Sequence, residues 1–483
     1  MTSYMQPDKT TMPQTPLVPM DKVKENYDVI VIGSGLGGLT CANRLARAGH
    51  SVLLLEHHTR LGGLATWFTR GGHIFDVSLH GFPYGMVKTC RKYWSPEIRD
   101  AIVQLPNIVF DNPQFSLTTT FSKDDFTRIL HDTFKIERSV IDDFFNTVRA
   151  MNFYDDQSLT TRELFDSFFP GRSDVHRLLM EPITYANGST LDDPAITYGI
   201  VFANFMNKGV FTFEGGTDRL IGMMTDELKK NGVTICTRAR VDRVIVEKGK
   251  TRGVAVGERI IGARAVVSNA GITNTIDKLV GREHFDDEFL SSFDKVEVNN
   301  SSCQVYFGIR KGESFDDVGD LLFTSRAKEF SSTEMRSMET KSRTFSIYYP
   351  KTRPQRPDYT VVASMNAEYD DWAHLDDQEY ARAKEAMIER CFDDLERYIP
   401  GIRDKVDTIE SATPKTFHRY TLHTRGTSFG TKFPGLEISR NLFHELPGLF
   451  HVGSVGIIMS GWLGAINYGV IVANDVDGYV RGL

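Results

Sequence analysis

The sequence predicts an α/β protein in which a Rossmann-type dinucleotide-binding domain is assembled from three segments and carries an inserted α+β substrate domain. Three observations predict this class. An apolar strand runs directly into a glycine-rich turn near the start of the chain. Glycine-rich segments with strand-like neighbours return in two later regions. The stretches between them have helical and alternating apolar patterns of their own.

The first element is a nucleotide-binding unit of strand, turn, helix and strand. Residues 28–33 form a short β-branched run that ends in glycine, as a central parallel strand does. The turn G-x-G-x-x-G follows at 33–38, and Ala and Leu recur at helical spacing over 39–48. A second apolar strand at 51–56 ends in an acid eighteen positions after the last glycine of the turn. This spacing is typical of a dinucleotide fold.

Each position of this unit has a physical reason. Gly33 permits the tight turn, Gly35 lets the backbone approach a pyrophosphate, and Gly38 allows helix and strand to pack closely. The helix N-terminus offers free N–H groups and positive potential to phosphates. Glu56 is placed to accept hydrogen bonds from ribose hydroxyls. The candidate nucleotide-binding residues of the turn are Gly33, Ser34, Gly35, Gly37 and Gly38.

Composition and charge exclude several classes of protein. Of 483 residues, 41% are hydrophobic and 25% are charged, which is the balance of a globular chain rather than a disordered one. The formal net charge is −7 and there is no long basic run, so nucleic acid is not an expected partner. Five cysteines without a C-x-x-C pair indicate neither a disulfide framework nor a zinc site, and favour a cytoplasmic location.

Two stretches bear on targeting. The first 26 residues lack a continuous apolar core, so we expect a flexible tail rather than a signal peptide. Residues 446–474 contain no Asp, Glu, Lys or Arg, as a transmembrane span would. Their many glycines instead favour a strand, a tight turn and a helix packed against a ligand.

A second glycine turn indicates which dinucleotide binds. Gly62 and Gly63 follow Glu56 within a few residues, where FAD-binding chains place such a turn. With the first turn and the motif at 72–76, this pattern resembles the flavin-dependent superfamily that includes amine oxidases and phytoene desaturases. The resemblance implies FAD as the cofactor and assigns four residues of the second turn to it, namely Gly62, Gly63, Leu64 and Ala65.

Later motifs make the resemblance more specific. Residues 213–220 and the strand-like run 265–270 resemble the segments that return to the nucleotide in phytoene desaturases, carotenoid isomerases and retinol saturases. The resemblance implies that Val241 lies against the adenine and that Asn269 contributes to the FAD site. The region 412–430 is also similar to these enzymes and fits amine oxidases less well.

The C-terminal region completes the pattern with one departure. Residues 448–453 resemble the strand and glycine that meet the flavin pyrophosphate, but serine stands at position 454, where an acid commonly follows. A serine hydroxyl can still bond a ribityl hydroxyl. Residues 460–466 resemble the helix start that lies beside the pyrimidine side of the flavin ring. The resemblance adds Gly453, Ser454, Gly464, Ala465 and Ile466 to the FAD-binding residues.

Because the nucleotide motifs occupy three places, we expect a discontinuous domain. The FAD-binding domain comprises 27–110, 207–300 and 410–483, and the substrate domain comprises 111–206 and 301–409. Apolar residues at helical spacing predict helices in the first insert, while the second insert predicts a mixed sheet and one amphipathic helix at 377–398. The 32 phenylalanines leave open an aromatic tunnel for a long lipid or an ordinary core, with core favoured for any single Phe.

The sequence shows no catalytic triad or metal cluster. None is required, because flavin carries the difficult step while the protein holds a C–H bond near the ring and excludes water. Candidates for acid–base help are His80, Tyr84, His418 and Tyr420, although a structural hydrogen bond is the commoner role of such residues. His418 and His423 do not share a helix face, so no metal site is expected.

The resemblance implies an FAD-dependent oxidoreductase that acts on C–C bonds of a long apolar polyene or isoprenoid lipid by desaturation, saturation or cis–trans isomerisation. Two alternatives stay open, a flavin amine oxidase-like enzyme and an FAD-containing binding protein without catalysis. Since an apolar substrate dissolves in bilayers, we also expect a peripheral membrane contact, made by the first insert. Enlarging Gly464 to Val is expected to block chemistry more than it reduces stability.

Overall fold

The computed structural model describes residues 17–152, 154–356 and 358–482. Its first sheet has the strand order β10-β2-β1-β13-β12-β11, and β19 pairs with β13 beside that path. The strands are β1 (Asn26–Ile32), β2 (Val52–Leu55), β10 (Thr234–Cys236), β11 (Arg243–Glu247), β12 (Lys250–Val256), β13 (Arg259–Ser268) and β19 (Leu449–His451). Strands β10, β2, β1, β13 and β19 are parallel, whereas β11 and β12 form an antiparallel extension.

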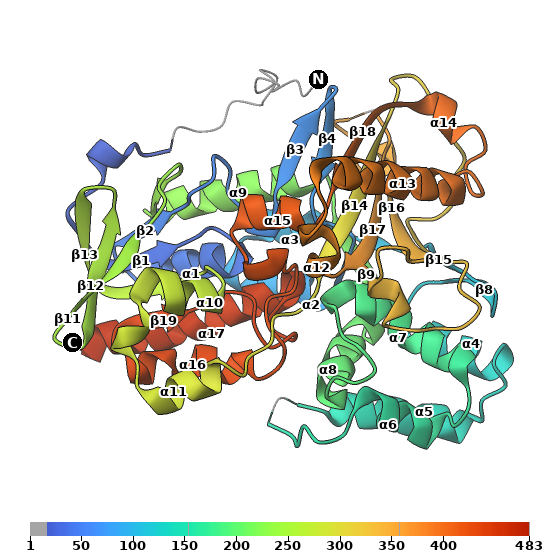
Figure 1. Cartoon of the computed structure of the whole chain (residues 1–483), viewed down its shortest axis with the longest axis horizontal. Coiled ribbons are helices and arrows are strands. Elements are labelled where there is room, and N and C mark those ends of the chain that lie inside the picture. The colour runs from blue at the N-terminus through green and yellow to red at the C-terminus, as the bar shows by residue number, and fades with distance from the viewer. Residues whose placement is uncertain (1–16, 153, 357, 483) are drawn as a thin grey trace.

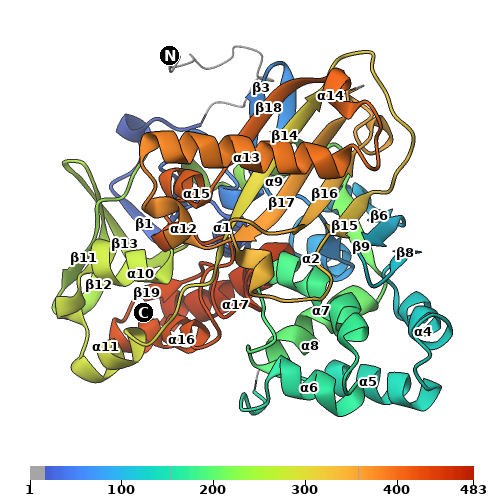
Figure 2. The same ribbon diagram turned by 45° about the vertical axis from the view of Figure 1, so that its right-hand side comes forward.

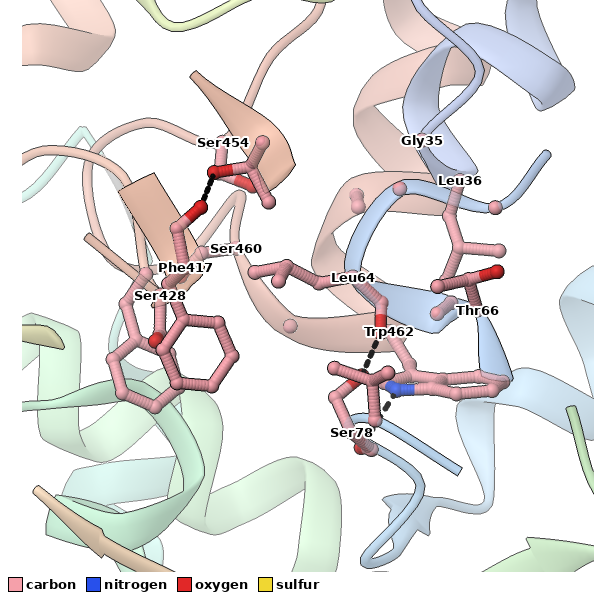
Figure 3. Close-up of a pocket in the computed structure, with 18 of the residues that line it drawn as sticks. Gly35, Leu36, Leu64, Thr66, Ser78, Phe417, Ser428, Ser454, Ser460 and Trp462 are labelled. Carbon is pink, nitrogen blue, oxygen red and sulfur yellow. Dashed lines mark hydrogen bonds between the residues drawn. The ribbon is translucent and has the colours of Figure 1, made fainter. Parts of the chain in front are cut away.

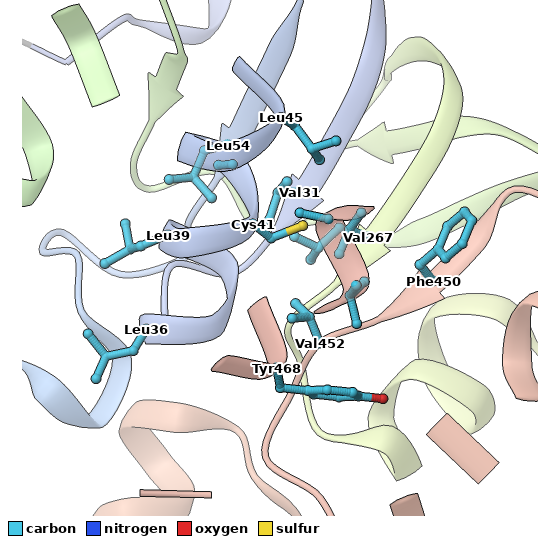
Figure 4. Close-up of a cluster of buried hydrophobic side chains, with 14 of the residues drawn as sticks. Val31, Leu36, Leu39, Cys41, Leu45, Leu54, Val267, Phe450, Val452 and Tyr468 are labelled. Carbon is cyan, nitrogen blue, oxygen red and sulfur yellow. The ribbon is translucent and has the colours of Figure 1, made fainter. Parts of the chain in front are cut away.

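The parallel strands are buried on both faces, as their continuous apolar runs predict. Helix α1 (Leu36–Arg47) packs on them, and Figure 4 shows Leu39, Cys41 and Leu45 of this helix beside Val31 and Val267. The last helix, α17 (Gly461–Gly482), crosses α1 so closely that a Cβ on Gly469 would lie 2.6 Å from the carbonyl oxygen of Gly37. The helix that starts at the first glycine turn is therefore held directly against the last helix described.

A second sheet lies at the opposite side of the molecule, with strand order β18-β14-β17-β16-β15-β7-β8 (Figure 1). Its strands are β7 (Ile108–Asp111), β8 (Ser116–Thr119), β14 (Ser301–Ile309), β15 (Leu321–Ser325), β16 (Ser342–Tyr348), β17 (Thr360–Ala367) and β18 (Val406–Ala412). Helix α13 (Asp377–Leu395) lies across one face of this sheet (Figure 2). Alternate residues of β14, such as Cys303 and Val305, pack in the core beneath α13, so their neighbours point to the other face.

The first insert forms a helical lobe, drawn in teal and green at the lower right of Figure 1. It consists of α4 (Lys123–Asp132), α5 (Arg138–Ala150), α6 (Thr161–Phe168), α7 (Ser173–Asn187) and α8 (Ala195–Met206). Phe144 lies at the centre of its core, with ring contacts to Phe165, Phe169 and Phe202. These phenylalanines fill an ordinary core, as favoured from the sequence.

Shorter elements connect these parts. The small sheets are β3 (Trp67–Arg70) with β4 (His73–Asp76), and β5 (Phe82–Pro83) with β9 (Val210–Phe213) and β6 (Ile102–Leu105). The remaining α-helices are α2 (Gly85–Tyr93), α3 (Pro96–Asp100), α9 (Thr217–Lys230), α10 (Ile272–Asn274), α11 (Asp287–Phe293), α12 (Tyr369–Ala373), α14 (Ile402–Lys405), α15 (Pro414–Thr421) and α16 (Gly435–Glu445). No helix within the described ranges is long and apolar enough to cross a membrane.

The predicted fold class is confirmed, but three details differ. Residues 17–26 do not form a loose tail, because Val18 N donates to Ile235 O at 2.9 Å and Val23 is buried; residues 1–16 lie outside the described ranges. The predicted boundaries after 110 and before 410 both cut strands of the second sheet, since β7 pairs with β15 and β18 with β14. The rest of the division into domains stays a prediction.

Candidate active site

A cavity of about 1120 Å³ lies between the first sheet and the second. At one end the two glycine turns line it, and at the other end the second sheet and helices α7 and α8 line it. Figure 3 shows Gly35, Leu36 and Leu64 on one side of this space and Phe417 and Ser428 on the other. The cavity therefore joins the predicted nucleotide site to the predicted substrate domain.

The two glycine turns meet back to back. Gly62 N donates to Ser34 O at 3.0 Å, and a Cβ on Gly63 would lie 2.9 Å from the Cα of Gly35. Helix α1 begins after Gly35 without any side chain capping its first N–H groups. Both turns thus present bare backbone to one place, and the free helix N-terminus there is suited to a pyrophosphate.

Glu56 is buried directly after β2, and both oxygens of its carboxylate accept hydrogen bonds. Its carboxylate accepts from Ser34 N at 2.9 Å, from Ser34 Oγ at 2.6 Å and from His58 N at 2.8 Å, and it pairs with His57 Nδ1 at 2.9 Å. Burial acts to raise its pKa, but the bonds from His57, Ser34 and His58 prevail and lower the pKa to about 2. Glu56 therefore stays charged, and it fixes the first glycine turn as well as facing the cavity.

The other predicted FAD-binding residues divide into two groups. Those that line the cavity are Gly33, Ser34, Gly35, Gly37, Glu56, Gly62, Gly63, Leu64, Ala65, Val241, Asn269, Ser454, Gly464 and Ala465. Gly38, Gly453 and Ile466 are not part of the lining. A Cβ on Gly38 would lie 2.3 Å from Gly33 O and one on Gly453 would lie 2.5 Å from Ala270 O, whereas Ile466 is a core residue. We call the backbone of the two glycine turns, residues 33–38 and 62–65, the cradle. These three residues pack behind the cavity lining and support it.

The packing around Gly464 leaves no room for a larger side chain. Its Cβ would meet backbone atoms of the preceding loop, with Ile458 O at 2.4 Å and the carbonyl carbon of Met459 at 3.1 Å. Backbone in that position cannot move aside without displacing the start of α17. The expectation that Gly464→Val would block chemistry more than it reduces stability is therefore not supported by the packing of this loop.

The residues of this end fit FAD. The uncapped α1 N-terminus and the two bare turns suit its pyrophosphate, and the charged Glu56 suits a ribose diol. When bound, FAD accepts or delivers a hydride. Sequence reasoning missed Ser78, which ties the cradle together: its Oγ donates to Leu64 O at 2.8 Å, and its carbonyl accepts from Trp462 Nε1 at 3.2 Å (Figure 3). Ser78 thus fixes the second turn relative to the start of α17.

The predicted acid–base candidates are not gathered in one place. His80 lines the cavity, where its Nδ1 bonds Ser346 Oγ at 2.8 Å and its Nε2 lies 3.2 Å from both Gln304 Nε2 and Ser364 Oγ. Since an amide nitrogen only donates, Nε2 accepts and the proton resides on Nδ1. Burial lowers the pKa of His80 to about 4, so the ring is neutral at pH 7. Tyr84 is outside the lining and packs on Phe211, with ring centroids 5.4 Å apart.

The candidates near position 420 also line the cavity. His418 Nδ1 bonds His423 O at 2.8 Å, and His423 Nδ1 bonds Thr427 O at 3.0 Å, so both rings hold the local loop. Tyr420 is exposed, and its backbone carbonyl lies 3.1 Å from His57 Nε2. These contacts are structural bonds at the nucleotide end.

The substrate end was not predicted residue by residue. Its wall comes from strands β14, β16 and β17 and from helices α7 and α8, and it includes Ser302, Gln304, Tyr306, Thr344, Ser364, Asn366, Tyr185, Ile183, Ile200 and Phe205. The signal in the sequence is the alternation of polar and apolar residues in β14, β16 and β17. Residues 121, 321 and 323 add aromatic and aliphatic surface.

This wall is neutral. Every Asp, Glu, Lys or Arg that lines the cavity comes from 56–70, from 240–278 or from Glu410, which pairs with Arg70 at 2.8 Å. Among the described residues of β14, β16, β17, α7 and α8, none with a formal charge contributes to the lining. Glu410 lies on β18 of the same sheet, and its charge is paired with that of Arg70. The nucleotide end therefore carries most of the charge, and the wall at the substrate end has no unpaired charge.

Comparisons with known proteins agree with this arrangement. An all-trans-retinol 13,14-reductase of Danio rerio is 24% identical over 85% of this chain and 78% of that protein. A chloroplastic prolycopene isomerase of Arabidopsis thaliana is 24% identical over 83% of this chain and 74% of that protein.

Solved structures share the fold. An oxidoreductase from Methanosarcina mazei has a TM-score of 0.67 at 18% identity and covers 92% of this chain and 99% of that chain. Putrescine oxidase bound to putrescine has a TM-score of 0.63 at 13% identity and covers 93% of this chain and 99% of that chain. Residues 36–476 match the flavin containing amine oxidoreductase family. The chain therefore belongs to that family and is an FAD-dependent enzyme.

Proposed function

We propose that this enzyme acts on C–C bonds of a long apolar polyene or isoprenoid, by desaturation, saturation or cis–trans isomerisation. The neutral substrate wall is the observation that carries the proposal. Burying a hydrocarbon chain against aliphatic, aromatic and uncharged polar groups is favourable, because it removes apolar surface from water. A buried ammonium group would need a nearby carboxylate. The one carboxylate of the second sheet that lines the cavity within the described ranges, Glu410, is already paired with Arg70.

The relatives support the same substrate class. Both are named for reactions on retinol or prolycopene, and the chain covers about three quarters of each. Amine oxidation is the alternative, since putrescine oxidase has the same fold at 13% identity. Because identity that low speaks for the fold alone, the neutral wall decides between the two.

In this proposal the chain's own residues position and shield the substrate. Gly35, Gly63 and the start of α1 hold the FAD pyrophosphate, and Glu56 holds a ribose. The neutral His80, with its proton fixed on Nδ1 by Ser346, belongs to the wall that orients the polyene. The wall also keeps water away from the C–H bond that reacts.

The test is spectroscopic and uses the purified FAD-loaded enzyme without oxygen. We expect a polyene from a panel of carotenes and retinoids to bleach the oxidised flavin, to reoxidise the reduced flavin, or to isomerise on the reduced enzyme, with products identified by chromatography. Turnover of a primary amine with release of hydrogen peroxide, and no change in any polyene with either flavin state, would overturn the proposal.

A peripheral contact with a membrane and a cytoplasmic location belong to the same proposal. A long apolar substrate is delivered and removed most readily where it dissolves. Cysteines that form no disulfide are typical of a reducing compartment, and the five cysteines of this chain are all free.

A further inference from the structure

Three segments far apart in the sequence contain no acidic residue. They are 77–96, 194–213 and 446–474, in a chain with 63 Asp and Glu in total. Their charged residues are all basic, namely Lys88, Arg91, Lys92 and Lys208. In a protein of net charge −7, this is a marked local reversal of sign.

The fold brings these segments together as α2, α8 and the first turns of α17. Lys88 of α2 and Lys208, just after α8, both approach the ring of Tyr84. Thr89 Oγ1 of α2 donates to Asn467 Oδ1 of α17 at 3.1 Å. Just before α2, the rings of Phe82 and Trp462 stack with centroids 5.6 Å apart. We call the surface formed by α2, α8 with Lys208, and residues 461–474 the basic face.

The cations of the basic face are exposed and have no acidic partner. Lys208 and Lys88 place their ammonium groups 4.6 and 5.8 Å from the centre of the Tyr84 ring. Arg91 and Lys92 are exposed on α2. Within the described ranges, none of the four basic residues forms an ion pair with Asp or Glu, so their charge is available to an external anionic surface.

The cavity reaches this same face. Asn204 of α8 and Ile471 of α17 are exposed and also line the cavity, and Ile471 is 41% exposed despite being a large aliphatic residue. Ile200 and Val201 are half-buried beside them. An apolar opening flanked by cations without an acidic partner matches the surface of a bilayer that contains anionic lipids, because such a bilayer has negatively charged headgroups over an apolar interior.

We propose that the basic face docks on an anionic phospholipid surface and turns the cavity opening toward the bilayer. The docking rests on charge and exposed apolar surface, while its purpose rests on the proposed apolar substrate. Lys88, Arg91, Lys92 and Lys208 contact the headgroups, and Ile471 and Ile200 meet the acyl boundary. This location refines the expectation of a contact in the first insert, because α8 belongs to that insert whereas α2 and α17 do not.

The test is flotation of the FAD-loaded protein with vesicles of phosphatidylcholine alone or mixed with phosphatidylserine. A variant with Lys88, Arg91, Lys92 and Lys208 all changed to Gln is expected to bind the mixed vesicles at least about tenfold more weakly. The matched control changes four exposed basic residues of the β11–β12 hairpin to Gln, namely Arg243, Lys248, Lys250 and Arg252, and is expected to bind normally. Flavin absorbance verifies that both variants are folded.

A fluorescent label gives a second readout that does not depend on charge removal. Since the native cysteines are buried, Asn207→Cys can be labelled selectively at the end of α8, with Lys248→Cys as the control site. We expect a blue shift of the label at 207 on mixed vesicles and none at 248.

Equal binding of the two charge variants, or equal shifts at the two labels, would overturn the proposal. Conversion of a dimer to a monomer in the four-residue variant would also overturn it and assign the face to a second copy of the chain. None of these measurements uses turnover. They therefore test the docking even if the enzyme proves not to act on a polyene.

Discussion

The two ends of the cavity are built in different ways. At the nucleotide end, backbone of the segments 33–38 and 62–65 forms the cradle, and Glu56 lies between them in the sequence. At the substrate end, single side chains from β14, β16, β17, α7 and α8 form the wall. A site made of backbone requires glycines at fixed spacing and so leaves a motif, whereas a site lined by side chains leaves only a weak alternation.

The two ends also treat ionisable groups in opposite ways. Glu56 is buried among donors, and its pKa falls to about 2, so the charge persists. His80 is buried among neutral groups, and its pKa falls to about 4, so the charge is lost. Burial alone opposes charge; what differs is whether the surroundings supply a compensating partner. Substitutions at either end test this contrast.

Gly464→Val should prevent folding rather than disable a folded enzyme. The new side chain would meet the backbone carbonyl of Ile458, so we expect a loss of more than about 4 kcal/mol in the free energy of unfolding. Gly222→Ala, in α9 with open space around its Cβ, is the control and should be neutral or slightly stabilising. Soluble yield and thermal denaturation measure both. A soluble, stable Gly464→Val protein would show that the loop before α17 can shift to make room for the new side chain.

Ser364→Asp should damage the substrate end alone. The new carboxylate would lie beside His80 and Gln304 in a wall without charge, so we expect kcat/KM for a polyene to fall about 100-fold because a buried charge is costly. Ser364→Asn has nearly the same shape without the charge, and should lose much less. Flavin content should match the wild type in both. Equal losses in the two variants would mean that shape, not charge, governs the wall.

Glu56→Gln should weaken FAD binding by about 10- to 100-fold, corresponding to about 1.5–3 kcal/mol for hydrogen bonds to a charged group. The exposed Glu258→Gln is the matched control. Because the pKa of Glu56 is lowered from 4.5 to about 2, its contribution to stability is present above pH 4.5 and is lost as pH falls toward 2. Flavin titration and acid denaturation follow the two effects. A variant that purifies with full flavin would contradict the role of this carboxylate.

His451 should make the nucleotide end sensitive to mild acid. It is buried between Ser439 Oγ and Ala270 O, at 2.7 and 2.8 Å, and burial lowers its pKa from 6.5 to about 4. In the unfolded chain His451 becomes protonated near pH 6.5, whereas in the folded chain it becomes protonated only near pH 4. Stability therefore falls as pH drops through this window, by about 2 kcal/mol at pH 5.

Urea denaturation at pH 7.5 and pH 5 measures this loss. His451→Gln should show a smaller difference between the two pH values than the wild type, whereas the exposed His131→Gln should not. The same difference in the free energy of unfolding between pH 7.5 and pH 5 in all three proteins would exclude His451 as the source of acid sensitivity.

The contrast between the two ends also explains what the sequence could predict. The spacing of Gly33, Gly35 and Gly38 before Glu56 predicted the first strands, the helix and a bound dinucleotide, because backbone geometry restricts those positions to glycine. The choice of FAD came from the second glycine turn and the family resemblance. Helix α13 and strands β14, β16 and β17 were predicted from periodicity. Ser364 and Gln304 were not predicted as cavity residues, since nothing in a strand's own sequence says which face meets a ligand. The boundaries placed after 110 and before 410 fall inside β7 and β18, because strand pairing between distant segments cannot be read from either segment alone.

The assembly of the first sheet has a consequence for biosynthesis. Strand β1 pairs with β13, β13 pairs with β19, and Gly37 of α1 is contacted by Gly469 of α17. The cradle therefore depends on contacts between segments more than four hundred residues apart. A nascent chain emerges from the ribosome at about 5–20 residues per second, so the earliest glycine turn waits tens of seconds for its last neighbours. Flavin can be captured firmly only after α17 has emerged, and until then the apolar strands of the cradle are exposed to chaperones and to aggregation.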